Sequence, residues 1–276
     1  MIYYLTIGVF IMSNQTAKAS HCRFSVNINK IALLRNSRGH HIPDLIEAAK
    51  LVIRAGAQGI TIHPRPDERH ARLSDIAALK NIPEIAQGLV ELNVEGYPRP
   101  ELLAAVKEAA VHQFTIVPSD PGELTSTRGW QDRDGEELLR KTVQFLKTFT
   151  KTSVFIDVNT AGVELAIRVG AQAVELITQE YSLCSGKERL QQLNQIVAVA
   201  NDARQKGLRV HLGHDLNAEN LPRLVQAVQP DEVSIGHAIV SEAVMAGLPQ
   251  IIRQYAQIIQ QEPQQPYHQS MGDQAP

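Results

Sequence analysis

Residues 59–70 read GITIHPRPDERH, and this stretch is the best guide to the fold of the chain. Its apolar part, 60–62, predicts a short buried strand that leads directly into two histidines and two arginines. In parallel β/α proteins, ligands bind where the strands end and the following loops begin. We therefore expect an anion-binding site at the end of this strand.

A second copy of the same pattern occurs later in the chain. Residues 55–63 (AGAQGITIH) correspond to residues 169–177 (VGAQAVELI). Each copy predicts a helix that ends at a glycine, a short turn and an apolar strand. Repetition of a βα unit indicates an architecture built from such units, but by itself it says little about function.

The remaining sequence alternates between short apolar stretches and longer amphipathic ones. Strands are predicted near 24–28, 59–63, 90–94, 113–117, 153–157, 172–177, 208–212 and 232–236. Helices are predicted near 43–55, 74–87, 99–110, 135–149, 160–169, 187–206, 217–228 and 238–260. Because no antiparallel hairpin signal separates these pairs, they favour a closed parallel (β/α)8 TIM barrel that forms one catalytic domain over residues 23–260.

Length and composition agree with this architecture and exclude some partners. The 276 residues, 43% of them hydrophobic, suit a single barrel domain. A net charge of −2 gives no basic field, so neither nucleic acid nor a membrane is an expected partner. Cys22 and Cys184 are too few for a disulfide scaffold or a CxxC metal site, which favours a reducing cytoplasm.

The two ends of the chain are expected to lie outside the barrel. Residues 1–22 are predicted to be a flexible extension whose apolar part, 1–12, is too short to span a bilayer. This part lacks the positive region of an export signal, and a translation start at Met12 is an alternative to Met1. Residues 261–276 are rich in Pro and Gln, which predicts a disordered polar tail.

Polar side chains follow nearly every predicted strand, at the end where a barrel site would lie. They are Asn27, Asn29, His63, Glu95, Asp157, Glu175, His214 and His237. Gly236 and the loop after Pro118 occupy the same strand-end positions. Any one of them could be a hydrogen-bonded rim residue. Core packing does not explain the whole set, so we interpret it as a candidate site.

The last two predicted strands both end in Gly-His, at 213–214 and 236–237. Loops after strands seven and eight commonly hold phosphate in barrels, since glycine lets the ligand approach the backbone and a helix N-terminus donates N–H groups. The helix predicted to begin at Ala238 suits this role, and further anion contacts are expected from Arg38, Arg65 and Arg69. The sequence has no Walker loop, GxGxxG or HExxH motif.

Metal binding is a weaker hypothesis. His63, Glu95 and His214 are residue types that can ligate a metal, but no compact ligand cluster in the sequence requires one. We therefore expect no metal.

Several motifs, taken in order, resemble the pyridoxine 5′-phosphate synthase (PdxJ) family over roughly residues 24–260. They are SVNINKIALLRNSRGH (25–40), AGAQGITIHPRPDERH (55–70), ELNVEG (91–96), VPSDPGELTSTRGW (117–130), VELITQEY (174–181), VHLGHDL (210–216) and IGHAIVSEAVMAGL (235–248). The resemblance implies a TIM barrel that condenses 1-deoxy-D-xylulose 5-phosphate with 3-amino-2-oxopropyl phosphate to pyridoxine 5′-phosphate, inorganic phosphate and water. It also implies that no cofactor is needed and that the protein is a homo-oligomer, as known members are octamers.

The resemblance also assigns roles to individual residues. His63 matches an acid/base histidine, Glu95 a catalytic glutamate, His214 a second catalytic histidine and Glu175 a residue that stabilises the transition state. Substrate-binding positions are matched by Asn27, Arg38, Arg65, His70, Thr125, Gly236 and His237. Imine formation, loss of phosphate and water, and ring closure all need repeated proton transfer, which suits a carboxylate and imidazoles with pKa values near neutrality.

The chain departs from the family pattern at three places. Asn29-Lys30 stands where the family has Asp-His, at positions that contact the deoxyxylulose phosphate. Asp215 stands where the family has Gly, and 177–179 (ITQ) replaces His-Thr-Gly. A carboxylate beside a phosphate loop is expected to weaken phosphate binding unless a cation, such as Lys30, pairs with it.

These departures leave two alternatives to an ordinary synthase. One is a diverged paralogue that condenses a different phosphorylated carbonyl and amine pair. An imine on Lys30 is one route for it, although a solvated surface amine explains this lysine more simply. The other is a non-catalytic phosphometabolite-binding protein, against which the presence of His63, Glu95 and His214 argues.

Overall fold

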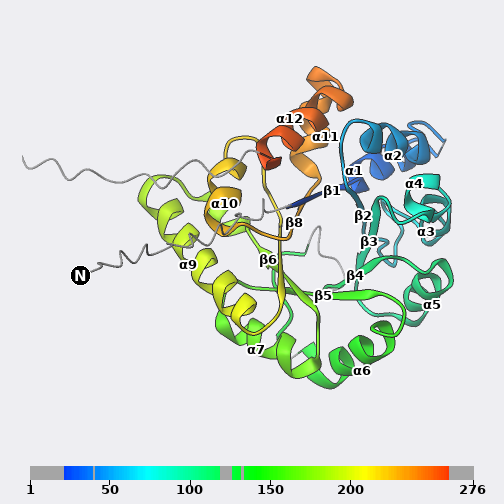
Figure 1. Ribbon diagram of the computed structural model, residues 1–276. Helices are drawn as coiled ribbons and strands as arrows, with labels where there is room; N and C mark the ends of the chain where they lie inside the picture. The colour runs from blue at the N-terminus through cyan, green and yellow to red at the C-terminus, as the bar shows by residue number, and fades with distance from the viewer. Residues whose placement is uncertain (1–21, 40, 119–125, 132–133, 261–276) are drawn as a thin grey trace, which may run out of the picture.

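The computed structural model describes residues 22–39, 41–118, 126–131 and 134–260, and these contain a closed barrel of eight parallel strands in the order β1 to β8 (Figure 1). The strands are β1 (Arg23–Asn27), β2 (Gly59–Ile62), β3 (Glu91–Gly96), β4 (Gln113–Ile116), β5 (Lys151–Ile156), β6 (Ala173–Ile177), β7 (Arg209–Gly213) and β8 (Glu232–Ile235). β8 pairs with β1, which closes the sheet. The predicted (β/α)8 barrel is confirmed.

Helices form a layer around the outside of the strands (Figure 1). They are α1 (Asn29–Asn36), α2 (Leu45–Arg54), α3 (Leu73–Lys80), α4 (Pro83–Ala86), α5 (Pro100–Ala109), α6 (Glu136–Leu146), α7 (Thr160–Val169), α8 (Gln179–Leu183), α9 (Gly186–Gln205), α10 (Leu221–Val228), α11 (His237–Ala246) and α12 (Leu248–Gln260). In the part of the chain that the structure describes, no helix is both long and apolar enough to span a membrane.

The repeat found in the sequence occupies equivalent places in two βα units. α2 ends before Gly56 and α7 ends at Gly170, whose φ angles are +117° and +81°. Glycine adopts these left-handed conformations at low cost, so both helices stop and turn into a strand, β2 in one unit and β6 in the other. At the other end of α2, the Asp44 carboxylate accepts hydrogen bonds from two first-turn N–H groups.

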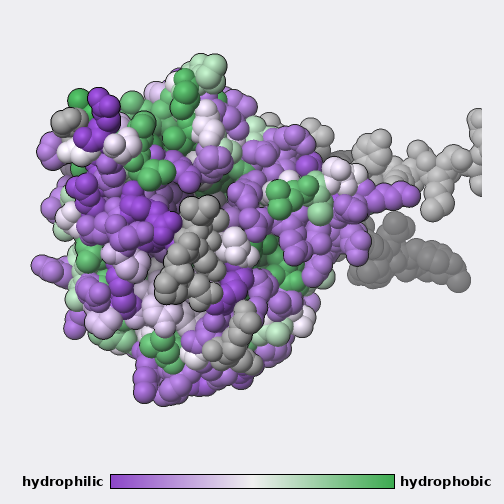
Figure 2. Space-filling view, turned by 180° about the vertical axis from the view of Figure 1, so that it is seen from behind, coloured by the Kyte–Doolittle hydropathy of each residue, from purple (hydrophilic) through white to green (hydrophobic). Residues whose placement is uncertain are grey.

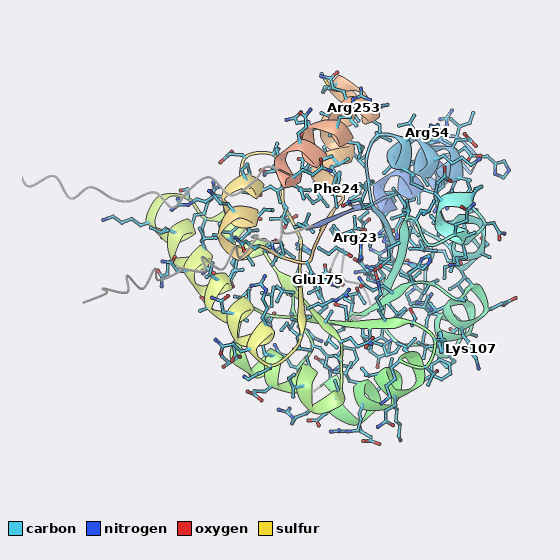
Figure 3. All side chains as sticks on the ribbon, in the orientation of Figure 1. Arg23, Phe24, Arg54, Lys107, Glu175 and Arg253 are labelled. Carbon is cyan, nitrogen blue, oxygen red and sulfur yellow. The ribbon has the colours of Figure 1, made fainter. Side chains whose placement is uncertain are left out.

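The interior of the barrel contains polar side chains, which alternate along each strand with apolar side chains that pack against the helices. Ser25 Oγ lies 2.7 Å from Thr61 Oγ1, and Asn93 hydrogen bonds to both Thr61 and Thr115. Gln113 on β4 reaches Glu232 on β8, on the opposite side of the barrel. Figure 3 shows the same division, with Arg23 and Glu175 lying towards the barrel axis while Arg54, Lys107 and Arg253 lie on outer helices.

Several predicted boundaries were wrong, for identifiable reasons. The predicted helix 74–87 is two helices, because Pro83 has no N–H to continue α3 and begins α4 instead. The predicted helix 238–260 breaks at Gly247 (φ +87°) into α11 and α12, and α11 begins one residue earlier than expected, at His237. Neither α1 nor α8 was predicted.

Candidate functional site

A cavity of about 570 Å³ opens at the carboxyl ends of the strands. This size and position are typical of a small-molecule site in a barrel. Of the predicted site residues, twelve line it: Asn27, Asn29, Lys30, His63, Arg65, His70, Glu95, Glu175, His214, Asp215, Gly236 and His237. The structure therefore brings together side chains that are separated by up to 210 residues in the sequence.

Arg38, Asp157 and Arg69 are not among the residues that line this cavity. Arg38 is exposed after the end of α1 and is not among the lining residues. Asp157 has a structural role, since its carboxylate accepts hydrogen bonds from Gly129 N–H and Gln131 Nε2. Arg69 pairs with Asp67 outside the cavity. Thr125 and the loop segment 119–125 lie outside the described residues.

His63 and Glu95 form the pair at the base of the cavity. His63 follows β2 and Glu95 lies on β3, and His63 Nδ1 is 3.8 Å from Glu95 Oε2. Burial, together with the nearby positive charge of Arg65, holds the pKa of His63 well below its usual value. The expected histidine pKa near neutrality is therefore wrong for His63. Burial, with help from Glu232, raises the pKa of Glu95 to about 8. At neutral pH the pair therefore consists of a neutral imidazole that can accept a proton and a carboxylic acid that can donate one.

Glu175 extends from β6 towards the same interior and is 4% exposed. Burial and the nearby Glu95 and Glu232 raise its pKa well above the usual value. A Cβ atom on Gly213 would lie 2.2 Å from Glu175 Oε1, so the side chain fits only because residue 213 is glycine. The glycine of the Gly-His pair at 213–214 is therefore explained by its close packing against Glu175, a candidate catalytic residue.

One end of the cavity offers donors for an anion. Arg65 is buried, and burial together with Arg65 and Arg69 lowers the pKa of His70 to about 4. His70 Nδ1 accepts a hydrogen bond from Ala71 N–H, so in the neutral ring Nε2 carries the proton and can donate it to a ligand oxygen. Lys30 is exposed at this end of the cavity.

The other Gly-His pair lies at the N-terminus of α11. Gly236 caps this helix, and a Cβ there would lie 3.0 Å from both the Cβ and the carbonyl oxygen of Asn27. Gly236, His237 and Ala238 line the cavity together. The first turn of a ten-residue helix, approached closely through a glycine, is a suitable second anion-binding region.

Asn29 is held in the site by its amide. Its Oδ1 accepts the His63 backbone N–H at 2.9 Å, and its own backbone N–H donates to Asn27 Oδ1 at 3.0 Å. An amide oxygen makes this link between the start of α1 and the residue after β2 as a carboxylate would, but without the negative charge beside His63. The departure at this position therefore preserves the geometry and changes the electrostatics.

The partner of Asp215 differs from the one expected. Within the described residues, its carboxylate receives hydrogen bonds from His214 Nδ1 and Gln179 Nε2, and no salt bridge joins it to Lys30. These same residues contain no group of three or more His, Cys, Asp or Glu side chains arranged to hold a metal.

Sequence reasoning missed part of the cavity lining, notably Val117, Ser126, Phe155, Ser182, Leu183, Leu216, Asn217 and Ser234. Phe155 lies two residues after Ser153 on β5 and so shares its inward face, a signal that counting by two would have found. Ser182 and Leu183 belong to α8, whose five residues are too few to show helical periodicity.

A protein-family model described as "Pyridoxal phosphate biosynthesis protein PdxJ" matches residues 24–261. The chain belongs to this family. A protein named pyridoxine 5′-phosphate synthase from Bacteroides thetaiotaomicron is 40% identical over 235 residues, which cover 84% of this chain and 97% of that protein. Its counterpart from Cytophaga hutchinsonii is 41% identical with the same coverage.

Two solved structures of low sequence identity show that this PdxJ chain shares their fold. Phosphoribosyl anthranilate isomerase from Thermotoga maritima has a TM-score of 0.55 at 16% identity and covers 86% of this chain and 98% of its own. The BexX/CysO complex from Amycolatopsis orientalis has a TM-score of 0.58 at 12% identity and covers 86% and 88%.

Proposed function

We propose that this PdxJ chain condenses 1-deoxy-D-xylulose 5-phosphate with 3-amino-2-oxopropyl phosphate to form pyridoxine 5′-phosphate, an enzymatic step of vitamin B6 biosynthesis. The observation that carries the proposal is one cavity lined by a buried His63–Glu95 pair and by two groups of residues suited to binding anions. Two phosphorylated substrates need two such groups, and repeated proton transfer needs an acid and a base between them.

In the proposed mechanism His63 is the base and Glu95 the acid. When the amine attacks the ketone, a C–N bond forms, and neutral His63 takes a proton from nitrogen and passes it to the former carbonyl oxygen, which becomes a hydroxyl. Glu95 then gives its proton to this hydroxyl, which leaves as water as the C–O bond breaks, and the remaining N–H proton returns to the Glu95 carboxylate as the imine forms. Glu175, held as an uncharged acid by its buried surroundings, would donate a hydrogen bond to an oxygen that becomes negative in the transition state. His214 would move the proton needed in ring closure.

The test is product formation. Purified protein given both phosphorylated substrates should yield pyridoxine 5′-phosphate, identified by mass spectrometry, together with inorganic phosphate. A folded protein that binds both substrates without turnover would support the phosphometabolite-binding alternative. A protein that turns over another carbonyl and amine pair, but not this one, would support the diverged paralogue.

Positions 29 and 30 separate the synthase from the paralogue. We expect the double change Asn29→Asp and Lys30→His, which restores the family pattern, to change KM for deoxyxylulose phosphate by less than about tenfold, because the Asn29 amide already makes the structural hydrogen bond to His63 N–H. Steady-state kinetics on each substrate would check this. A much larger gain in kcat/KM, confined to deoxyxylulose phosphate, would instead show that the natural residues serve a different substrate.

We also propose that the protein forms a homo-oligomer through α11. Most of this helix is apolar, yet Ile239 is its only residue described as buried, and Val244 and Met245 are 77% and 88% exposed. Leu34 on the neighbouring α1 is 57% exposed, and hydrophobic side chains gather at this edge of the molecule in Figure 2. An exposed apolar patch of this kind commonly marks an interface.

Light scattering would test the oligomer. The expected mass is a multiple of the 30.5 kDa chain, and Val244→Glu with Met245→Glu should lower it. A wild-type mass of 30.5 kDa at micromolar concentration would contradict the proposal.

We further propose that the reaction takes place in the cytoplasm, since Cys22 and Cys184 are both free thiols, as in a reducing compartment.

A further inference from the structure

The loop after β7 has an unusual backbone at two consecutive residues. His214 and Asp215 have φ angles of +89° and +56°. Residues other than glycine adopt positive φ angles at an energetic cost, and this cost is smaller for aspartate than for most residues. Two such residues in a row persist only where the surrounding contacts fix them, and they cluster at functional sites.

Contacts from the residue after β6 and the residue before α10 hold this loop. Thr178 donates its backbone N–H to Gly213 O at 2.9 Å, and its Oγ1 lies 2.8 Å and 2.6 Å from the carbonyl oxygens of Gly213 and His214. Asn220 Nδ2 donates to the Asp215 carbonyl oxygen at 3.2 Å. The strained pair is therefore anchored on both sides.

The side chains of the pair bond to each other. His214 Nδ1 lies 3.1 Å from Asp215 Oδ2, and Gln179 Nε2 donates to the same Oδ2 at 3.2 Å. The hydrogen bond from His214 holds the pKa of Asp215 below its usual value. The carboxylate is thus ionised and can only accept, so Nδ1 must carry a proton.

We propose that Asp215, itself oriented by Gln179, is a positioning residue that fixes His214 in the tautomer with the proton on Nδ1 and presents unprotonated Nε2 to the cavity. His214 lines the cavity, its side chain is 13% exposed, and its ring is tilted against Phe155 at 6.5 Å. A second-sphere carboxylate commonly sets which imidazole nitrogen is free.

Two independent features of this chain meet in this contact. The side chains of Asp215 and Gln179, which are 36 residues apart in the sequence, are hydrogen-bonded to each other. A bonded pair of this kind is expected when one side chain serves to hold the other. The carboxylate therefore does not lie beside the phosphate site as an uncompensated charge.

The consequence for the reaction rests on the proposed function. A proton leaving a bound intermediate passes to Nε2 of His214, which becomes an imidazolium whose Nδ1–H stays bonded to Asp215. The adjacent carboxylate stabilises this positive ring. When the proton returns to a leaving hydroxyl or phosphate oxygen, the ring reverts to the starting tautomer.

Nitrogen-15 NMR of histidine-labelled protein tests the proposal without any substrate. The His214 signals, assigned with His214→Gln, should show the Nδ1–H tautomer in the natural protein. Asp215→Gly should shift the ring to a mixture or to the Nε2–H tautomer, and glycine suits the backbone at φ +56°, so folding should be retained. With both substrates, Asp215→Gly should lower kcat by about tenfold or more while KM changes little.

Glu219→Gln is the matched control, because Glu219 is an exposed carboxylate of the same loop that pairs with Arg189 instead of His214. It should leave both the tautomer and the rate unchanged. An unchanged His214 tautomer in Asp215→Gly would overturn the proposal, even if the protein makes pyridoxine 5′-phosphate. A shifted tautomer in a protein that makes no such product would contradict the proposed function and leave the role of Asp215 intact.

Discussion

Glu95→Gln is expected to lower kcat by about 10²- to 10⁴-fold, the range typical of the loss of a general acid. Glutamine has nearly the same shape as glutamate but has no carboxylic proton to donate. In the natural protein, burial raises the pKa of Glu95 to about 8, so the proton is present at neutral pH. KM for both substrates should change much less than kcat, since neither anion-binding region includes Glu95. Stopped assays of pyridoxine 5′-phosphate formation would measure both constants.

The pH profile gives this prediction a second readout. The acid form of Glu95 is lost as pH rises through about 8, so the natural enzyme should lose activity above that pH. The residual activity of Glu95→Gln should lack this decline. A matched control is Glu101→Gln on α5, an exposed carboxylate whose loss should leave the rate and the profile unchanged. A Glu95→Gln variant that keeps more than about a tenth of the natural rate would exclude Glu95 as the main acid.

The barrel could be predicted from the sequence because its signals are local and repeated. Gly56 and Gly170 end helices at equivalent points, and each is followed by a short apolar strand. The positions of His63, Glu95 and His214 also followed from counting to the end of each strand, since parallel strands in a closed barrel present those ends together. Boundaries were less predictable where Pro83 and Gly247 interrupt otherwise continuous helical patterns.

Electrostatic states could not be predicted, because they depend on burial and on contacts between distant segments. The pKa of His70 is lowered to about 4 by partial burial of its ring and by the charges of Arg65 and Arg69, and no local sequence pattern indicates that burial. The partner of Asp215 was likewise hidden, since Gln179 is 36 residues away and belongs to the unpredicted α8. The assignment of Arg38 to the site rests on a motif match alone and stays a prediction, since its side chain is exposed and is not among the residues that line the cavity.

Arg23→Met is expected to destabilise the folded protein by about 3–5 kcal/mol, because it removes the cation that forms a salt bridge with the buried Glu232. Arg23 Nη1 lies 2.9 Å from Glu91 Oε2 and 3.1 Å from Glu232 Oε2 at the end of the barrel opposite the cavity. The side chains of Glu91 and Glu232 are 9% and 3% exposed. After the change, Lys151 still pairs with Glu91, and among the described residues Glu232 keeps a hydrogen bond from the Gln113 amide at 3.4 Å. Urea denaturation followed by circular dichroism would measure the loss.

The pH dependence of the stability loss in Arg23→Met tests whether the Glu232 carboxylate causes it. Burial and Glu91 already raise the pKa of Glu232 to about 7, and removal of Arg23 should raise it further. Between its unfolded value near 4.5 and this raised value, the folded state binds more protons than the unfolded state, so stability falls as pH rises. Arg23→Met should therefore cost more at pH 8 than at pH 5, and adding Glu232→Gln should recover much of the loss at pH 8.

Arg253→Met on the outer helix α12 is the control for side-chain loss, and it should change stability by less than about 0.5 kcal/mol at either pH. A cost for Arg23→Met that is equally small would show that water, not Arg23, compensates the interior carboxylates. The result also bears on catalysis, because Glu232 contributes to the raised pKa values of Glu95 and Glu175. If Glu232→Gln moves the alkaline decline in activity to lower pH, the polar interior connects the far end of the barrel to the acid that the reaction uses.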